Sequence, residues 1–183
     1  MTTANKITLI RIALIPVFMV LMLLDQSATR IAALLIFIIA GVTDHIDGYV
    51  ARKYNQITIF GKFMDPLADK IMVISAMMIL VAWGRMPSWA AIIIIAREFA
   101  VSGLRLVAAA KGDIIAAGFS GKLKTAVSII AICFMITDRV HEFMIIPNIL
   151  SVDMAGSWLI VIVTVWSGVE YFVRNRKILD YKS

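Results

Sequence analysis

Residues 43–70, TDHIDGYVARKYNQITIFGKFMDPLADK, decide the fold, because they place four aspartates inside a strongly apolar sequence. These are Asp44, Asp47, Asp65 and Asp69, with long apolar segments on both sides. A carboxylate near the centre of a bilayer costs about 2.5 to 3.5 kcal/mol on insertion scales, so four of them need a compensating partner. Divalent cations are the partner that carboxylate oxygens suggest.

The whole chain has the composition of an integral membrane protein. Of its 183 residues, 61% are hydrophobic and 16% are charged, which is more apolar than the core of a soluble domain requires. Each membrane crossing needs about 20 apolar residues, so this length accommodates one helical bundle. We therefore expect a single membrane domain over residues 1–183. The net charge of +6 is scattered between apolar runs, which favours anionic lipid and phosphate ligands and disfavours nucleic acid.

Apolar segments separated by polar turns predict an all-α integral membrane protein with six transmembrane helices. The predicted spans cover about residues 11–24, 29–53, 59–83, 88–110, 126–137 with a start nearer 120, and 150–173. Before the first span, polar and apolar residues alternate over residues 1–10, which predicts a short N-terminal amphipathic helix on the membrane surface.

Six spans put both termini on one side of the membrane, and the basic residues identify that side. All but three of the 18 Lys and Arg residues fall on the side of the termini and the aspartates; the exceptions are Arg30, Arg85 and Arg139. Cytoplasmic loops of membrane proteins are enriched in Lys and Arg. Both termini and the aspartate cluster are therefore predicted to be cytoplasmic.

Helical geometry predicts that the four aspartates meet. At about 100° per residue, Asp44 and Asp47 share one face of their helix. On the next helix Gly61, Asp65 and Asp69 recur at intervals of four, so they also share a face. Two antiparallel helices then present two carboxylates each to one spot. Oxygen ligands without Cys or His suit two divalent cations, Mg²⁺ or Mn²⁺, better than zinc.

Small residues beside the aspartates leave room for a ligand. Gly48 and Gly61 lack side chains where the two helices face the site, so a nucleotide or diphosphate can approach the backbone. Arg52 lies on the same face as the first two aspartates and would neutralise a phosphate. Intramembrane acids also line transporters and ion channels. The position of these acids at one end of their spans argues against that alternative.

The ordered pattern D-x2-D-G-x2-A-R-x8-G-x3-D-x3-D resembles the signature of the CDP-alcohol phosphotransferase family. The matching positions are Asp44, Asp47, Gly48, Ala51, Arg52, Gly61, Asp65 and Asp69. The resemblance implies a six-helix membrane enzyme that binds two divalent metals and a CDP-linked lipid. An acceptor hydroxyl would attack the β-phosphorus of that lipid in line, and CMP would be released.

The resemblance also implies roles for individual residues. The metal ligands would be Asp44, Asp47, Asp65 and Asp69. The last of these would also be the general base. The cytidine and diphosphate pocket would be formed by Gly48, Ala51, Arg52 and Gly61. The start of the chain matches the family pattern N-x2-T-x2-R, which closes over the nucleotide, through Asn5, Thr8 and Arg11, although Ala4 stands where the family often has proline.

A second group of basic residues predicts the chemistry of the acceptor. Arg97 and Arg105 are eight residues apart, so both can face one pocket, and Lys122 and Lys124 begin a later span. Such cations suit a phosphorylated acceptor, because each donates charge-assisted hydrogen bonds to phosphate oxygens. Cytoplasmic topology alone also requires cations on this side. Glu98 is expected to orient Arg105 or Lys122.

Three further motifs are similar to bacterial members of the family that use sn-glycerol 3-phosphate. They are D-P-L-A-D-K at 65–70, I-A-R-E-x3-S-G-L-R at 95–105 and W-S-G-x-E-Y at 166–171. This resemblance implies transfer of a phosphatidyl group from CDP-diacylglycerol to sn-glycerol 3-phosphate, with another acceptor such as inositol phosphate as the alternative. It implies a multi-pass protein of the bacterial cytoplasmic (inner) membrane, surrounded by membrane lipid, with its active site facing the cytoplasm. Because family members commonly form homodimers, a homodimer is expected.

Overall fold

The computed structural model describes residues 3–24, 26–53, 59–110, 118–137, 144–146 and 150–176. Side chains are described for part of these ranges only, and the four aspartates of residues 43–70 lie outside that part. The helices are α1 (Thr3–Leu23), α2 (Ser27–Lys53), α3 (Ile59–Ala82), α4 (Ser88–Ala110), α5 (Phe119–Ile136) and α6 (Val152–Arg174). The described part of the chain is therefore almost entirely helical, as the sequence predicts.

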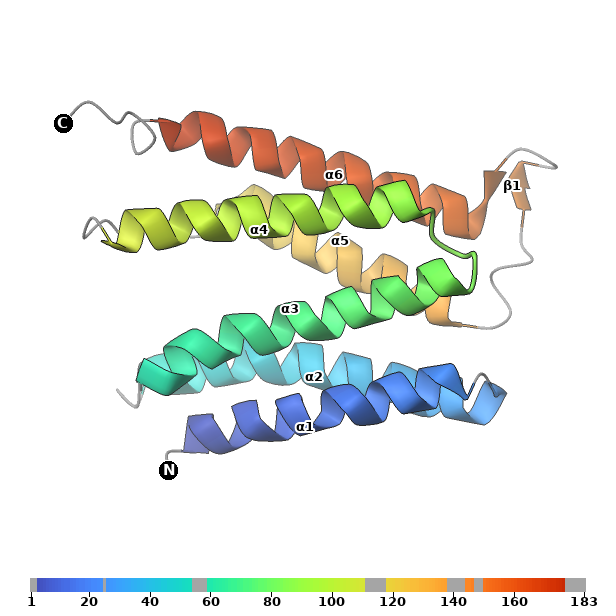
Figure 1. The fold of residues 1–183 in the computed structure, drawn as a ribbon, viewed down its shortest axis with the longest axis horizontal. Helices are drawn as coiled ribbons and strands as arrows, with labels where there is room; N and C mark the ends of the chain where they lie inside the picture. The colour runs from blue at the N-terminus through green and yellow to red at the C-terminus, as the bar shows by residue number, and fades with distance from the viewer. Residues whose placement is uncertain are drawn as a thin grey trace.

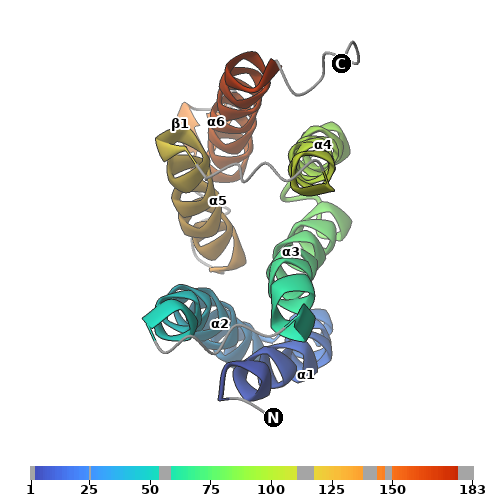
Figure 2. The same cartoon turned by 90° about the vertical axis from the view of Figure 1, so that its left-hand side faces the viewer.

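The helices run along the long axis of the molecule and reverse direction from one to the next (Figure 1). As a result α1 begins and α6 ends at the same end of the bundle, which we call the termini end. The starts of α3 and α5 and the ends of α2 and α4 lie there too. Helix α1 packs against α2 and α3, and α6 packs against α4 and α5. Figure 2 shows α3 between α1 and α4, where it joins these two groups of three helices.

One prediction about the N-terminus is wrong. Residues 1–10 were expected to form a separate amphipathic helix, whereas α1 continues without a break from Thr3 to Leu23. No Gly or Pro separates the polar start from the apolar run, and extending an existing helix is easier than nucleating a second one. Pro16 lies inside α1 and does not end it, as is common where neighbouring helices pack around a proline.

A short hairpin before α6 was not predicted. Strands β1 (Met144–Ile146) and β2 (Leu150–Ser151) pair in antiparallel fashion. Ser151 then caps α6, because its side chain accepts a hydrogen bond from the backbone N–H of Met154. The hairpin therefore fixes where the last helix begins.

Among the residues that the structure describes, two helices, α5 and α6, are long and apolar enough to cross a membrane by length and composition. Shorter apolar stretches of described residues occupy Leu9–Leu23, Ser27–Gly41 and Lys70–Ala82. Large apolar side chains are exposed along the outer faces, including Ile92, as expected for contact with lipid. Six complete crossings remain a prediction.

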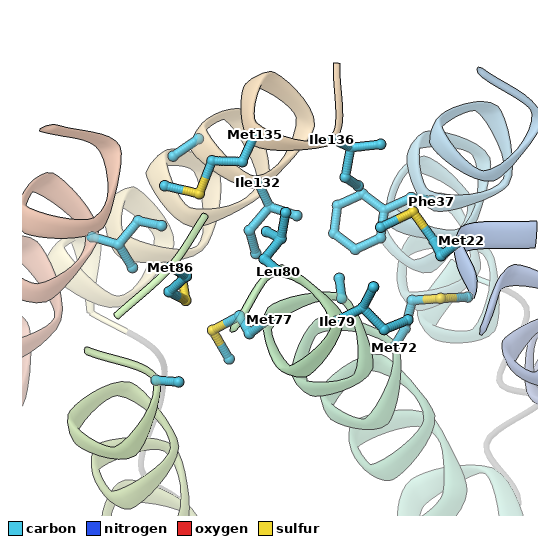
Figure 3. Packing of buried hydrophobic residues seen from close by; sticks show 14 of the residues in the cluster. Met22, Phe37, Met72, Met77, Ile79, Leu80, Met86, Ile132, Met135 and Ile136 are labelled. Carbon is cyan, nitrogen blue, oxygen red and sulfur yellow. The ribbon is translucent and has the colours of Figure 1, made fainter. Parts of the chain in front are cut away.

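One apolar core joins all six helices. Phe18 of α1 and Phe37 of α2 place their ring centroids 5.8 Å apart. Leu80 of α3 and Ile132 of α5 are fully buried in the same cluster, which connects the two groups of helices. Figure 3 shows these side chains directed into a shared interior with several methionines. Methionine fills irregular gaps between helices, so the abundance of this residue in the sequence has a structural role.

The turn between α3 and α4 depends on Gly84. Its φ of +73° lies in the left-handed region. The N–H of Gly84 donates to the carbonyl of Val81 at 3.0 Å, and the N–H of Arg85 donates to that of Leu80 at 2.9 Å. This pair of bonds is the Schellman motif that closes a helix C-terminus.

Replacing Gly84 with alanine is expected to lower the free energy of unfolding by about 1 to 2 kcal/mol, because a Cβ strains the left-handed backbone. Thermal unfolding in detergent measures the effect. Gly103→Ala is the matched control, since its added Cβ has no atom within 4 Å and its backbone is helical. Equal stability of the two variants would contradict the role given to this turn.

Candidate active site

The bundle gathers the predicted site residues on helix segments at its termini end. The last turns of α2 and the first turns of α3 carry the aspartate motif, and these helices are in contact. The side chains of the following predicted residues lie outside the described part: Asn5, Thr8, Asp44, Asp47, Gly48, Ala51, Arg52, Gly61, Asp65 and Asp69. Their convergence on one spot stays a prediction. Arg11 is described; it is 3% exposed and lies in the half of α1 nearer this end.

A partly buried ionic cluster links α3, α4 and α5 near the middle of the bundle. Lys124 of α5 donates from Nζ to Oε1 of Glu98 at 2.5 Å, and Arg97 donates from Nη1 to the same oxygen at 3.1 Å. The side chain of Lys124 is 6% exposed, that of Glu98 is 21% exposed and that of Arg97 is 13% exposed. Lys70 of α3 also attracts the Glu98 carboxylate and contacts Ser102 Oγ. We call these five residues the Glu98 cluster.

The Glu98 cluster has more positive than negative charge. Arg97 and Lys124 both donate to the one carboxylate of Glu98. Buried charges are stable only when they are compensated, so an excess of cations favours an anionic ligand. The Nε atom of Arg97 is buried and has no hydrogen-bond partner among the described residues. A cavity of about 40 Å³ beside the cluster, lined in part by Thr125 and Ser128, has room for ordered water.

Two arginines of α4 are held by α6. Arg97 donates from Nη2 to Ser167 Oγ at 2.9 Å. Arg105 donates from Nε to the Tyr171 hydroxyl at 3.1 Å, and its guanidinium lies over the Tyr171 ring at 5.4 Å from the centroid. Arg105 and Lys122 are exposed, whereas Arg97 and Lys124 lie inside the bundle. The four predicted cations therefore divide into an inner and an outer pair.

The prediction of which residues pair with Glu98 is wrong. The sequence suggested Arg105 or Lys122, whereas the structure pairs Glu98 with Lys124 and Arg97. Arg105 lies about 10 Å further along α4, at 1.5 Å per residue, and Lys122 points to the surface. The side chain of Lys124 instead enters the interior, where only Glu98 balances its charge among the described residues.

Sequence reasoning missed four residues of this site: Lys70, Ser102, Ser167 and Tyr171. The last two belong to the W-S-G-x-E-Y motif, and their spacing of four places them on one helix face. That spacing was the available signal. Lys70 and Ser102 also lie in motifs, D-P-L-A-D-K and I-A-R-E-x3-S-G-L-R, but these motifs did not predict that the two side chains, 32 residues apart in the chain, are in contact.

A larger cavity, of about 730 Å³, lies at the opposite end of the bundle. Its lining includes Trp83, with the guanidinium groups of Arg30 and Arg85 at 4.9 and 5.1 Å from the ring centroid. Such Arg and Trp contacts are typical of residues anchored at a membrane interface. The aspartate motif lies on the turns of α2 and α3 toward the termini end and the Glu98 cluster near the middle of the bundle, so size alone does not make this cavity the active site.

A family model described as CDP-alcohol phosphatidyltransferase matches residues 1–166. The chain belongs to the CDP-alcohol phosphatidyltransferase family. The matched range contains the complete aspartate motif and the cations of α4 and α5. The chain is thus an enzyme of the CDP-alcohol phosphatidyltransferase kind, a transferase of phospholipid biosynthesis and a membrane protein.

Similar proteins occur in distant bacteria. A Bacillus subtilis protein named CDP-diacylglycerol–glycerol-3-phosphate 3-phosphatidyltransferase is 47% identical over 184 residues, covering 93% of each chain. A Haemophilus influenzae protein of the same name is 38% identical over 182 residues, covering 95% of this chain and 94% of its own. A Mycobacterium tuberculosis protein named probable phosphatidylglycerophosphate synthase is 36% identical over 174 residues, covering 93% and 80%.

CDP-alcohol phosphatidyltransferases generally depend on divalent cations. Among the side chains that the structure describes, no three His, Cys, Asp or Glu residues lie close enough to hold a metal ion. The motif aspartates are not among those side chains. Their chemistry fits, because they supply carboxylate oxygens from two helices that are in contact at the termini end.

Proposed function

We propose that the enzyme transfers the phosphatidyl group of CDP-diacylglycerol to sn-glycerol 3-phosphate, giving phosphatidylglycerol phosphate and CMP. The acceptor is inferred from the Glu98 cluster, in which Arg97 and Lys124 both donate to one carboxylate and Lys70 directly follows Asp69 of the aspartate motif. The names of the bacterial relatives support the same pair of substrates.

The positive charge of Arg97 and Lys124 suits a phosphomonoester. At neutral pH such a group carries a charge of about −1.5 to −2. Arg97 and Lys124, in the interior, would hold the phosphate. Arg105 and Lys122, on the surface, would attract it from solution.

The aspartate motif would bind the metal ions that hold the CDP-diacylglycerol donor, and it would also supply the general base. Asp44, Asp47, Asp65 and Asp69 would hold two divalent cations, Mg²⁺ or Mn²⁺, which when bound offset the charge of the donor diphosphate. Asp69 would accept the proton of the acceptor hydroxyl. The hydroxyl oxygen then bonds to the β-phosphorus in line, while the bond from that phosphorus to the CMP oxygen breaks.

The nucleotide would bind beside these aspartates. Gly48 and Gly61 have no side chain and Ala51 has a small one, which leaves room for cytidine and diphosphate beside the helices. Arg52 would pair with a phosphate oxygen, since a guanidinium matches phosphate geometry. From the start of α1, Asn5, Thr8 and Arg11 would close over the nucleotide.

The same proposal includes the placement in the membrane. One domain over residues 1–183 would cross the bacterial cytoplasmic (inner) membrane six times, with both termini and the active site facing the cytoplasm. The positive residues at the termini end support this orientation. A homodimer within membrane lipid completes the arrangement.

The reaction is tested with purified enzyme, CDP-diacylglycerol and Mg²⁺, by comparing CMP release across acceptors. We expect release with sn-glycerol 3-phosphate to exceed that with glycerol, the matched acceptor without phosphate, by at least about tenfold, because the phosphate contacts are charge-assisted. Inositol phosphate tests the alternative acceptor. No CMP release with any acceptor would contradict the reaction class, and ion flux in vesicles without CMP would indicate a transporter.

A further inference from the structure

One face of α6 contacts both arginines of α4. Ser167 and Tyr171 are one helical turn apart on α6, and they accept hydrogen bonds from Arg97 and Arg105 respectively. Helices α4 and α6 pack side by side along the bundle (Figures 1 and 2). Neither Ser167 nor Tyr171 belongs to the aspartate motif, so we look for their role in the hydrogen bonds that they accept from the two arginines.

Ser167 presents only its oxygen lone pairs to Arg97. Its hydroxyl proton is donated to the Thr164 carbonyl at 3.1 Å, which orients the oxygen as an acceptor for Arg97 Nη2. The other terminal nitrogen of Arg97, Nη1, donates to Glu98. The guanidinium is thus held at two corners by residues from two helices, and its plane is fixed.

Gly168 makes this position of Arg97 sterically accessible. A Cβ at residue 168 would lie 3.1 Å from Arg97 Cγ and 3.4 Å from Nε. Contacts of 3.1 Å are tighter than normal carbon packing, so any larger residue would push the arginine stem away from α6. The glycine of the W-S-G-x-E-Y motif therefore has a packing role that follows from its neighbour on α4.

Tyr171 is itself held in place. Its ring is 8% exposed and forms a small apolar cluster with Val101 and Leu104 of α4. Arg105, although exposed, both stacks on this ring and donates to its hydroxyl. A buried platform fixes the end of a long, otherwise mobile side chain, which reduces the entropy lost when a ligand binds.

We propose that Ser167, Gly168 and Tyr171 are positioning residues that set Arg97 and Arg105 for the phosphate of the acceptor, and so determine preference for phosphomonoester acceptors. This inference rests on the proposed function. In this arrangement α6 holds the arginines in place before the acceptor binds, while the charged residues of the site come from α4 and α5.

The test measures separate KM values for the two substrates in Ser167→Ala and Tyr171→Phe. Each variant is expected to raise KM for sn-glycerol 3-phosphate about tenfold, as for loss of one hydrogen bond to a charged group, and to leave KM for CDP-diacylglycerol within twofold. The ratio of activity with sn-glycerol 3-phosphate to activity with glycerol should fall in parallel. Ser157→Ala is the matched control, because Ser157 is buried in α6 and, among the residues that the structure describes, donates to the Asp153 carbonyl of its own helix.

Coupling to the arginine is tested by a double-mutant cycle. Ser167→Ala added to Arg97→Lys should cause little further rise in acceptor KM, because Ser167 acts through the guanidinium. Gly168→Ala should raise acceptor KM as well, whereas Gly41→Ala, whose Cβ makes an ordinary 3.8 Å contact with Ile129, should not.

Three results would overturn the inference: unchanged acceptor KM in all three α6 variants, an equal rise in KM for both substrates, or additive effects in the cycle. Size-exclusion profiles in detergent confirm that each variant is folded. Absence of CMP release by the wild-type enzyme with sn-glycerol 3-phosphate is a separate outcome, which contradicts the proposed function and removes the basis of the inference with it.

Discussion

Replacing Asp69 with asparagine is expected to reduce turnover about 100- to 10,000-fold. The amide keeps the size of the side chain, but it neither accepts the proton of the acceptor hydroxyl nor carries the charge that a cation requires. General base catalysis alone contributes about this factor in enzymes. The measurement is the rate of CMP release at saturating CDP-diacylglycerol and sn-glycerol 3-phosphate, normalised to folded protein.

The control for Asp69→Asn is the same substitution at Asp153. Asp153 is buried near the start of α6, at the opposite end of the bundle from the aspartate motif. Loss of charge there affects stability without touching the reacting groups, so turnover per folded molecule should remain within about threefold of wild type. Near-normal turnover of Asp69→Asn would contradict its role as base and ligand.

Replacing Glu98 with glutamine is expected to destabilise the enzyme by about 3 kcal/mol. The substitution leaves Lys124, whose side chain is 6% exposed, without its carboxylate partner. Removing one member of a buried ion pair costs about 3 to 5 kcal/mol, and the partial exposure of Glu98 places this case at the lower end. For a chain of this length the thermal midpoint should fall by about 6 to 12 °C, measured by unfolding in detergent.

A second substitution separates stability from binding. Lys124→Met in the Glu98→Gln background removes the uncompensated ammonium, so most of the lost stability should return. In the double variant, KM for the acceptor should be higher than in the wild-type enzyme, because one phosphate-binding cation is gone. If the double variant is no more stable than Glu98→Gln, the pairing of these two residues does not explain the loss.

The helices were predictable because each apolar run ends at recognisable polar or turn-forming residues. Gly84 and Pro87, for example, separate α3 from α4, and the structure ends α3 at Ala82. The continuity of α1 was not predictable from polarity, since a change from polar to apolar residues does not require a break in the backbone. The β1 and β2 hairpin was missed because both strands are very short.

The candidate site was predictable where the signal lies within one helix. The spacing of Arg97 and Arg105 predicted that both can face one pocket, and in the structure both donate hydrogen bonds to α6. The partner of Glu98 was missed, because Lys124 belongs to another helix, α5, and is 26 residues further along the chain. Helical periodicity describes one helix at a time and contains no information about which neighbour crosses it. The converging aspartates lie outside the described side chains and remain a prediction.

The central claim is that an acceptor hydroxyl attacks the β-phosphorus of CDP-diacylglycerol at the termini end of the bundle. The most direct measurement uses sn-glycerol 3-phosphate labelled with ¹⁸O in the attacking hydroxyl and follows the label by mass spectrometry. We expect equal amounts of CMP and lipid product, with ¹⁸O in the new phosphodiester and none in CMP. Label in CMP, or a lipid product without label, would contradict it.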